Sequence, residues 1–254
     1  MEKLSAAIIT FNEERNIRRC IESLLPIADE IVVLDSNSTD GTRSICEEYT
    51  LVRFHAQPFE GHIQQKNAAA ALTAHHLVLS LDADEVISEE LKLSILEVKQ
   101  NRKFDGYTMN RLTSYCGKWI RHCGWYPDRK IRLFDKRKGA WGGINPHDKY
   151  ELLPGGTQAH IDGDILHFSY NSFEELQRQT DKFAKLGAQH LFDKGLGSAW
   201  VKLFFSPTVR FLRAYFFKLG FLDGVAGFTI SWYSAVECFR KYNYLRKRVF
   251  ESQS

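Results

Sequence analysis

The first 100 residues alternate between short apolar runs and longer amphipathic stretches. A continuous apolar run predicts a strand covered on both faces, because a strand with one wet face would alternate apolar and polar residues. Such runs occur at residues 4–10, 30–34 and 76–81, with a shorter candidate at 51–55. Helices are predicted between them, over 12–25, 38–49 and 61–74. This alternation predicts an α/β fold, with a mostly parallel central sheet flanked by helices on both faces.

The pattern changes after residue 100. Short β-like pieces rich in Gly, Trp, Tyr and His occur at 107–111, 130–134 and 165–168. A helix is predicted over 172–194, with an inner face formed by Phe173, Leu176, Phe183 and Leu186. We therefore expect one domain over residues 1–199, with halves at 1–100 and 101–170, and a separate tail over 200–254.

Composition narrows the class of protein. The 254 residues are 44% hydrophobic and 26% charged, near the averages of globular proteins, which excludes a disordered or collagen-like chain. A net charge of +3 is too small to indicate nucleic acid as the main ligand. The five cysteines lack zinc-finger spacing and the N-terminus lacks a signal-peptide pattern. We therefore expect a reduced, cytoplasmic location.

Residues 200–254 differ from the rest of the chain. They hold nine Lys and Arg against three acids, a net charge of +6, and 15 of the 33 aromatic residues. The apolar stretches are shorter than the roughly 20 residues that cross a bilayer. On a helical wheel Arg210, Arg213 and Lys218 share one arc, opposite an apolar arc that includes Leu212 and Leu219. Such a tail is typical of a helical segment lying on an anionic membrane surface; a docked helical pair or a homo-oligomer contact is the alternative.

Two carboxylates directly follow the predicted strand at 76–81, in the sequence Leu81-Asp82-Ala83-Asp84-Glu85. In open α/β sheets this edge is where ligands bind. Adjacent carboxylates repel each other, which favours a nearby divalent cation or water. A solvated turn that caps the next helix is the ordinary alternative. LSLDADEV also matches the aspartyl-nucleophile motif of haloacid-dehalogenase-type phosphatases, although that motif typically opens its fold and here two βα units precede it.

Four motifs in order carry a family resemblance: IITFNEE (8–14), VVLDSNSTDGT (32–42), the pair Lys66-Asn67, and LDAD (81–84). Together they resemble glycosyltransferase family 2, which uses the GT-A fold, an α/β domain that binds nucleotide-sugars. The resemblance is close over residues 4–87 and loose elsewhere. It implies that 1–199 is a GT-A catalytic domain, with the nucleotide-sugar half at 1–100 and the acceptor half at 101–170, followed by a helical C-terminal extension.

The resemblance implies that Thr10, Phe11, Asn12 and Glu14 line the nucleotide pocket, and that Asp35 holds the base or ribose. The sequence has Asp-Ser-Asn-Ser where many relatives have Asp-Asp-Gly-Ser, so one acidic contact is missing. Asp40, in the same loop, is expected to form a turn rather than bind a ligand.

Three further positions match the part of the family pattern that handles the diphosphate. Lys66 would lie near the nucleotide or diphosphate, Asp82 near the ribose edge, and Asp84 on the divalent cation. Hard oxygen ligands suit Mg²⁺ or Mn²⁺ better than zinc or copper.

The acceptor hydroxyl loses a proton as it attacks, which needs a general base. Asp148, in the segment Gly-Gly-Ile-Asn-Pro-His-Asp, resembles a His-Glu pair in the lipopolysaccharide-core branch of the family and is the first candidate; Glu85 and Asp128 are reserves. His167 or His147 would add a third metal ligand or a phosphate contact. The aromatic residues of this region would face a sugar ring or fill the core: Trp119, Trp125, Tyr126 and Trp141.

The resemblance therefore implies an inverting, metal-dependent hexosyltransferase, similar to lipopolysaccharide-core β-glucosyltransferases that use UDP-glucose. Its partners would be a UDP-sugar donor, a lipid-linked saccharide acceptor and the inner face of the cell membrane. Transfer to another membrane acceptor such as a polyprenyl phosphate, phosphatase activity, and a non-catalytic membrane-attached binding protein are the alternatives.

Overall fold

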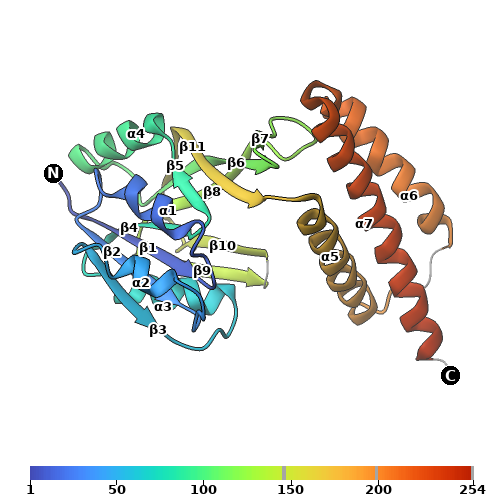
Figure 1. Ribbon diagram of the computed structural model, residues 1–254, viewed down its shortest axis with the longest axis horizontal. Helices are drawn as coiled ribbons and strands as arrows, with labels where there is room; N and C mark the ends of the chain where they lie inside the picture. Colours follow the sequence, from blue (N-terminus) through green and yellow to red (C-terminus); the bar gives the residue numbers. More distant parts are fainter. Residues whose placement is uncertain (145–146, 198–199, 253–254) are drawn as a thin grey trace. The chain divides into compact units, whose positions relative to one another are not determined.

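The computed structural model describes residues 1–144, 147–197 and 200–252. Its first 82 residues build a parallel half-sheet in the order β3-β2-β1-β4 (Figure 1). The strands are β1 (Leu4–Thr10), β2 (Glu30–Asp35), β3 (Val52–Ala56) and β4 (Leu77–Asp82). Their register sets Thr10 beside Asp35 and Ile9 beside Asp82. The carboxyl ends of the three central strands therefore place polar side chains at one edge.

Later strands extend this sheet in antiparallel fashion, beginning with β8 against β4. They are β5 (Glu85–Ile87), β6 (Gly106–Tyr115), β8 (Asp128–Asp135) and β11 (Gln158–Tyr170). A separate hairpin pairs β9 (Gly139–Ile144) with β10 (His147–Leu152), and β7 (Lys118–Trp119) pairs with the end of β6. The predicted α/β class and the parallel half are confirmed. The pieces expected at 107–111, 130–134 and 165–168 all lie within longer strands.

Helices cover both faces of the half-sheet because β1 is apolar on both. One face carries Ala6 and Ile8 into a core shared with α1 (Ile17–Leu24), α2 (Thr42–Cys46) and α4 (Glu89–Gln100). The other carries Ala7 and Ile9 into a core shared with α3 (His62–Leu72) and the β9–β10 hairpin. Helices α1 and α2 are shorter than predicted, because the residues before each form loops that bind each other, as described below.

Residues 112–127 and 169–254 form a second compact unit, and residues 1–111 and 128–168 form the first. The second unit holds α5 (Phe173–Asp193), α6 (Trp200–Leu212) and α7 (Gly224–Glu251). Between α6 and α7 lie a π-helical turn, η1 (Arg213–Phe217), and a 3-10 turn, η2 (Gly220–Asp223). Helix α5, which we expected within the domain over residues 1–199, thus belongs to the same unit as the tail.

The inner face predicted for α5 is wrong in part. Its buried residues recur every four positions and are mostly small: Leu176, Thr180, Ala184 and Ala188. Phe173 and Leu186 are instead exposed. Small side chains let α5 and α7 approach closely, and Gln177 Nε2 donates to the hydroxyl of Tyr233 at 2.7 Å across this contact.

The regular helical wheel expected for the tail does not hold beyond Leu212. The π-helical turn changes the angular spacing, and Leu219 takes a left-handed conformation (φ 53°) that ends the helix. Arg213 begins the π-helical turn and Lys218 lies just after it, so a single α-helical wheel does not extend from Arg210 to Lys218. Within the described ranges, no helix combines the length and apolar character needed to span a bilayer.

Candidate active site

The loops after β1 and β2 are joined by reciprocal hydrogen bonds. Asn12, in a left-handed conformation (φ 54°), donates its backbone N–H to Ser38 Oγ at 2.7 Å and accepts from the N–H of Thr39 at 2.8 Å. Glu14 accepts from the N–H of Gly41 at 2.9 Å. Asn12 and Glu14, both expected to line a nucleotide pocket, thus shape the loops that would form it.

Thr10 and Phe11, two of the residues expected in the pocket, differ in their exposure to solvent. The hydroxyl of Thr10 is buried and has no hydrogen-bond partner within the described part of the chain. The adjacent Phe11 is exposed over 56% of its surface. A buried hydroxyl without a partner is costly unless a ligand or water satisfies it, so this pair is suited to receive a flat, polar-edged group.

Asp35 and Asp40 both serve their own loop. Asp35 is buried and accepts from the N–H of Ser38 at 2.7 Å, and its second oxygen accepts from the Ser38 hydroxyl. Asp40 accepts from the N–H and hydroxyl of Thr42, which fits the turn role expected for it. A contact of Asp35 with a base or ribose would use the remaining lone pairs of its oxygens.

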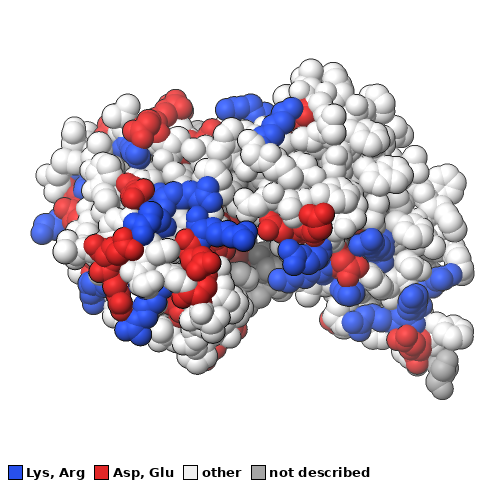
Figure 2. Space-filling model, viewed as in Figure 1, with Lys and Arg blue, Asp and Glu red and all other residues white. Residues whose placement is uncertain are grey.

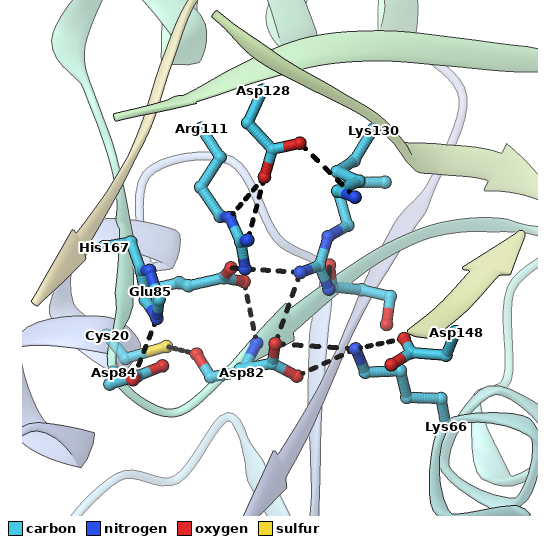
Figure 3. Close-up of polar contacts among 12 residues, drawn as sticks. Cys20, Lys66, Asp82, Asp84, Glu85, Arg111, Asp128, Lys130, Asp148 and His167 are labelled. Carbon is cyan, nitrogen blue, oxygen red and sulfur yellow. Dashed lines mark hydrogen bonds and ion pairs between the residues drawn. The ribbon is translucent and has the colours of Figure 1, made fainter. Parts of the chain in front are cut away.

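Lys66, on α3, links two carboxylates that are distant in sequence (Figure 3). Its Nζ lies 3.1 Å from Asp82 Oδ1 and 2.8 Å from Asp148 Oδ2. The Lys66 side chain is only 4% exposed, so its charge is compensated by these two neighbours rather than by water. The structure therefore brings together the expected diphosphate lysine, the first acid of the LDAD motif and the candidate base.

A second buried cation lies on the other side of Asp82. Arg132 Nη2 is 3.2 Å from Asp82 Oδ2 and 3.0 Å from Glu85 Oε1, and its side chain is 4% exposed. Burial disfavours the charged carboxylate, but Lys66 and Arg132 outweigh it and hold the pKa of Asp82 far below its usual range. Asp82 is therefore ionised at any physiological pH.

Glu85 and Asp128, the reserve candidates for the base, form ion pairs with arginines (Figure 3). Glu85 is fully buried; it accepts from the N–H of Asp82 at 2.9 Å and pairs with Arg132 and, at 3.6 Å, with Arg111. Asp128 pairs with Arg111 at 2.8 Å and with Lys130 at 3.3 Å. These contacts favour a positioning task for both acids.

Asp84 and His167 face each other at the end of β4 and on β11. His167 Nε2 lies 3.1 Å from Asp84 Oδ2, and the two side chains are 14% and 24% exposed. Burial opposes the charged imidazolium, but the charge and hydrogen bond of Asp84 outweigh it, so the pKa of His167 lies above its ordinary value. Burial and the nearby charge of Asp84 likewise raise the pKa of Glu13.

The donor atoms of Asp84 and His167 fit a divalent cation that also binds a substrate phosphate. Over the described residues, no group of three or more His, Cys, Asp or Glu side chains could enclose a metal ion. Mg²⁺ usually keeps waters and uses one or two carboxylates plus substrate phosphates. A site with two protein ligands is therefore compatible with that cation. The side chain of His147, the other histidine considered, lies outside the described residues.

Trp141 is a core residue that also borders the charged cluster. It is buried among Phe134, Tyr150 and the face of the sheet that carries α3. Its ring centroid is 4.6 Å from Lys66 Nζ and 5.6 Å from the Arg132 guanidinium carbon. Stacking on an aromatic face further compensates the two buried cations.

Sequence reasoning missed Arg111 and Arg132, although a signal was present. Asp128, Lys130 and Arg132 alternate along β8, and residues two apart on a strand share one face. Arg111 is opposite Asp128 in the register of β6 and β8. In β8, charged residues at every second position next to apolar residues indicated a polar cluster on the inward face of the strand.

Comparison with known proteins identifies the family. The sequence profile described as Glycosyl transferase family 2 matches residues 5–151. The chain is 30% identical over 247 residues to the lipopolysaccharide core biosynthesis glycosyltransferase LpsC of Rhizobium meliloti (strain 1021), covering 93% of this chain and 89% of that protein. It is 28% identical to an uncharacterized glycosyltransferase of Rickettsia felis, covering 100% of this chain and 93% of that protein.

A solved structure shows the same fold. The mannosyltransferase PcManGT from Pyrobaculum calidifontis, in complex with GDP-Man and Mn²⁺, aligns with a TM-score of 0.57 at 13% identity, covering 99% of this chain and 88% of that one. The phosphatase interpretation of LSLDADEV is therefore wrong: the motif begins in β4, the fourth strand of a different fold, and Asp82 is bound by two cations. The profile match and the LpsC relative establish that the chain belongs to glycosyltransferase family 2 and is a glycosyltransferase with the GT-A fold.

Proposed function

We propose that the enzyme is an inverting, metal-dependent hexosyltransferase that moves glucose from UDP-glucose onto an inner-core sugar of lipopolysaccharide. The relative LpsC, named for lipopolysaccharide core biosynthesis, supports the acceptor class. The observation that carries the reaction type is the juxtaposition of Lys66, Asp82 and Asp148, with the Asp84–His167 pair on the neighbouring strands.

Asp84 and His167 would hold the divalent cation, Mg²⁺ or Mn²⁺. When bound, such a cation neutralises the negative charge that the departing nucleotide gains. Asp84 supplies a hard carboxylate oxygen, and His167 supplies an imidazole nitrogen once its proton is lost. Lys66 contributes a second positive charge; its partners Asp82 and Asp148 keep its ammonium group fixed at 2.8–3.1 Å from their oxygens.

Asp148 would remove the proton of the acceptor hydroxyl. Its Oδ2 accepts from Lys66 at 2.8 Å, so its second oxygen can face a hydroxyl while the lysine holds the carboxylate in place. Thr10, Phe11, Asn12 and Glu14 would form the nucleotide pocket with Asp35. In this arrangement the donor and the acceptor meet over the carboxyl ends of β1 and β4.

A donor and acceptor screen tests the proposal. Calorimetric titrations with UDP-, GDP- and ADP-sugars, each with and without Mn²⁺, should show metal-dependent binding of UDP-glucose above the others. Transfer should then occur to a core oligosaccharide that ends in heptose, and not to a polyprenyl phosphate. Preference for another nucleotide or for the polyprenyl phosphate would replace the substrate assignment but leave the family membership intact.

We further propose that the enzyme is peripheral on the inner face of the cell membrane, where a lipid-linked saccharide is accessible. The five cysteines are all free thiols, as expected in a reducing compartment. Lys247 and Arg248 are exposed near the end of α7. Each cation near an anionic bilayer contributes on the order of 1 kcal/mol, so Lys247→Gln/Arg248→Gln should weaken binding to anionic vesicles roughly 30-fold at low salt.

The matched control for this variant is Arg43→Gln/Lys149→Gln, which removes two exposed cations from the first unit. It should bind vesicles like the wild type in co-sedimentation at low salt. Equal binding by both double variants would show that the end of α7 is not the electrostatic contact.

A further inference from the structure

Helix α6, the turn that follows it and the start of α7 present apolar side chains to the outside. Phe217 and Val225 are exposed over 82% and 84% of their surface, and Phe216 and Leu222 over more than half. On α6 the exposed apolar residues recur at steps of four, four and three, which places them on one helical face: Val201, Phe205, Val209 and Leu212. Figure 2 shows that charged side chains are sparse over this part of the second unit on the side turned to the viewer.

The turn between α6 and α7, residues 213–223, is held firmly from the inside. Asp223 is buried and accepts from the backbone N–H of His122 at 2.9 Å, while its carbonyl accepts from Lys118 Nζ at 2.6 Å. Gly220 is so closely packed that an added Cβ would lie 2.9 Å from Cys123 Sγ. Polar contacts and close packing therefore fix the backbone of the turn from the inside, while Phe216 and Phe217 remain exposed.

The charges around this surface favour a lipid bilayer over a protein partner. Residues 200–222 contain no Asp or Glu. The next acid, Asp223, points inward. Lys202, Arg210, Arg213 and Lys218 are all exposed. Exposed aromatic and aliphatic residues in a segment whose own charged side chains are all cations are complementary to anionic headgroups above an acyl layer.

We propose that the α6–α7 turn, the first residues of α7 and the exposed face of α6 insert into the headgroup–acyl boundary of an anionic membrane, with Phe216, Phe217, Leu222 and Val225 as the inserted side chains. This inference rests on the proposed peripheral membrane location and deepens it. Helix α7 would contribute long-range attraction through its basic end, and the turn would contribute apolar burial. Binding should therefore retain a component that salt does not remove.

The first test uses full-length protein and vesicles of phosphatidylcholine with 30% phosphatidylglycerol. The variant Phe216→Ser/Phe217→Ser should lose more than about tenfold in vesicle partitioning at high salt, because it removes two large apolar side chains from the boundary. The control Leu93→Ser, at a leucine that is 70% exposed on α4, should partition within about twofold of the wild type. Equal loss in both variants would overturn the assignment to the turn.

The second test locates the turn directly. An environment-sensitive fluorophore is attached to Phe217→Cys in a Cys116→Ser background, because Cys116 is the exposed native thiol. Emission should shift to the blue on vesicle addition and be quenched by lipids brominated on the acyl chain. Strong wild-type binding without quenching would refute insertion while leaving membrane association standing. If the wild-type protein does not bind vesicles, or forms dimers through this face in sedimentation experiments without lipid, both the insertion of the turn and the membrane association are overturned.

Discussion

The buried carboxylate of Glu85 provides the sharpest test of how the charged cluster is organised. Glu85 Oε1 faces Arg132 at 3.0 Å and Arg111 at 3.6 Å, and Oε2 accepts from the N–H of Asp82 at 2.9 Å. Glutamine has the same shape but only one acceptor oxygen. In Glu85→Gln the NH₂ group would therefore face another donor, either the N–H of Asp82 or the guanidinium of Arg132. The substitution would also leave the buried Arg132 with Asp82 as its remaining carboxylate in this contact.

Removing one partner of a buried, hydrogen-bonded charge pair typically costs about 3–5 kcal/mol. Glu85 is 0% exposed and the Arg132 side chain 4% exposed, so solvent screening offers little relief. At roughly 2–4 °C per kcal/mol for a unit of this size, the melting temperature of the first unit should fall by about 10 °C. The kcat should fall as well, because the amide cannot both accept from the N–H of Asp82 and pair with Arg132 and Arg111 as the carboxylate does.

Calorimetry and urea unfolding of the wild type, Glu85→Gln and Glu97→Gln measure the effect. Glu97 is exposed on α4, so the same chemical change there should move stability by less than about 0.5 kcal/mol. A loss below about 1 kcal/mol for Glu85→Gln, together with a kcat reduced by ~10²–10⁴-fold, would refute this reasoning. That result would make Glu85 the general base.

The remaining predictions concern other carboxylates. Asp84→Ala should abolish metal-dependent UDP binding in calorimetry while lowering the melting temperature only slightly, because the side chain is 24% exposed and its main task in the proposed site is to hold the cation; retained metal-dependent activity would contradict the metal site. Asp148→Asn should lower kcat by ~10²–10⁴-fold with nucleotide affinity nearly unchanged, and a loss below tenfold would move the base elsewhere. Burial opposes ionisation of Asp135, but Arg137 and Arg102 outweigh it and lower its pKa. Its stabilisation is therefore present above about pH 4 and lost as pH falls toward the folded-state pKa. Urea unfolding of Asp135→Asn should show a deficit of roughly 1.5–3 kcal/mol at pH 7 that shrinks below pH 4, and a deficit constant down to pH 2 would contradict this.

The parallel half of the fold was predictable because its strands are continuous apolar runs. All four predicted strands of residues 4–82 are present, with bounds that differ by one residue or so. The helices were less predictable. Asn12 and Ser38 bind across two loops, and these long-range hydrogen bonds replace the first turns that local propensity favours.

The candidate site was predictable where residues follow strands and unpredictable where they lie within them. Thr10, Asp35 and Asp82 end parallel strands, so their proximity follows from topology. That Lys66 contacts Asp148 depends on how α3 packs against the β9–β10 hairpin, which no local pattern encodes. Helix α5 shows the same limit, since the pattern favoured its largest apolar residues whereas the helix contact selects its small ones.

In the tail, the position of each charged side chain in the folded unit is more informative than the net charge of residues 200–254. The sequence assigns residues 200–254 a net charge of +6, which includes three acids. In the folded unit Asp223 is directed inward to His122 and Lys118, and Glu237 is partly buried, with burial raising its pKa. Of these three acids, Glu251, at the end of α7, is the one that is exposed. The exposed surface is thus more basic than the sequence total implies, and its exposed phenylalanines Phe216 and Phe217 lie in a segment, residues 200–222, that contains no acid.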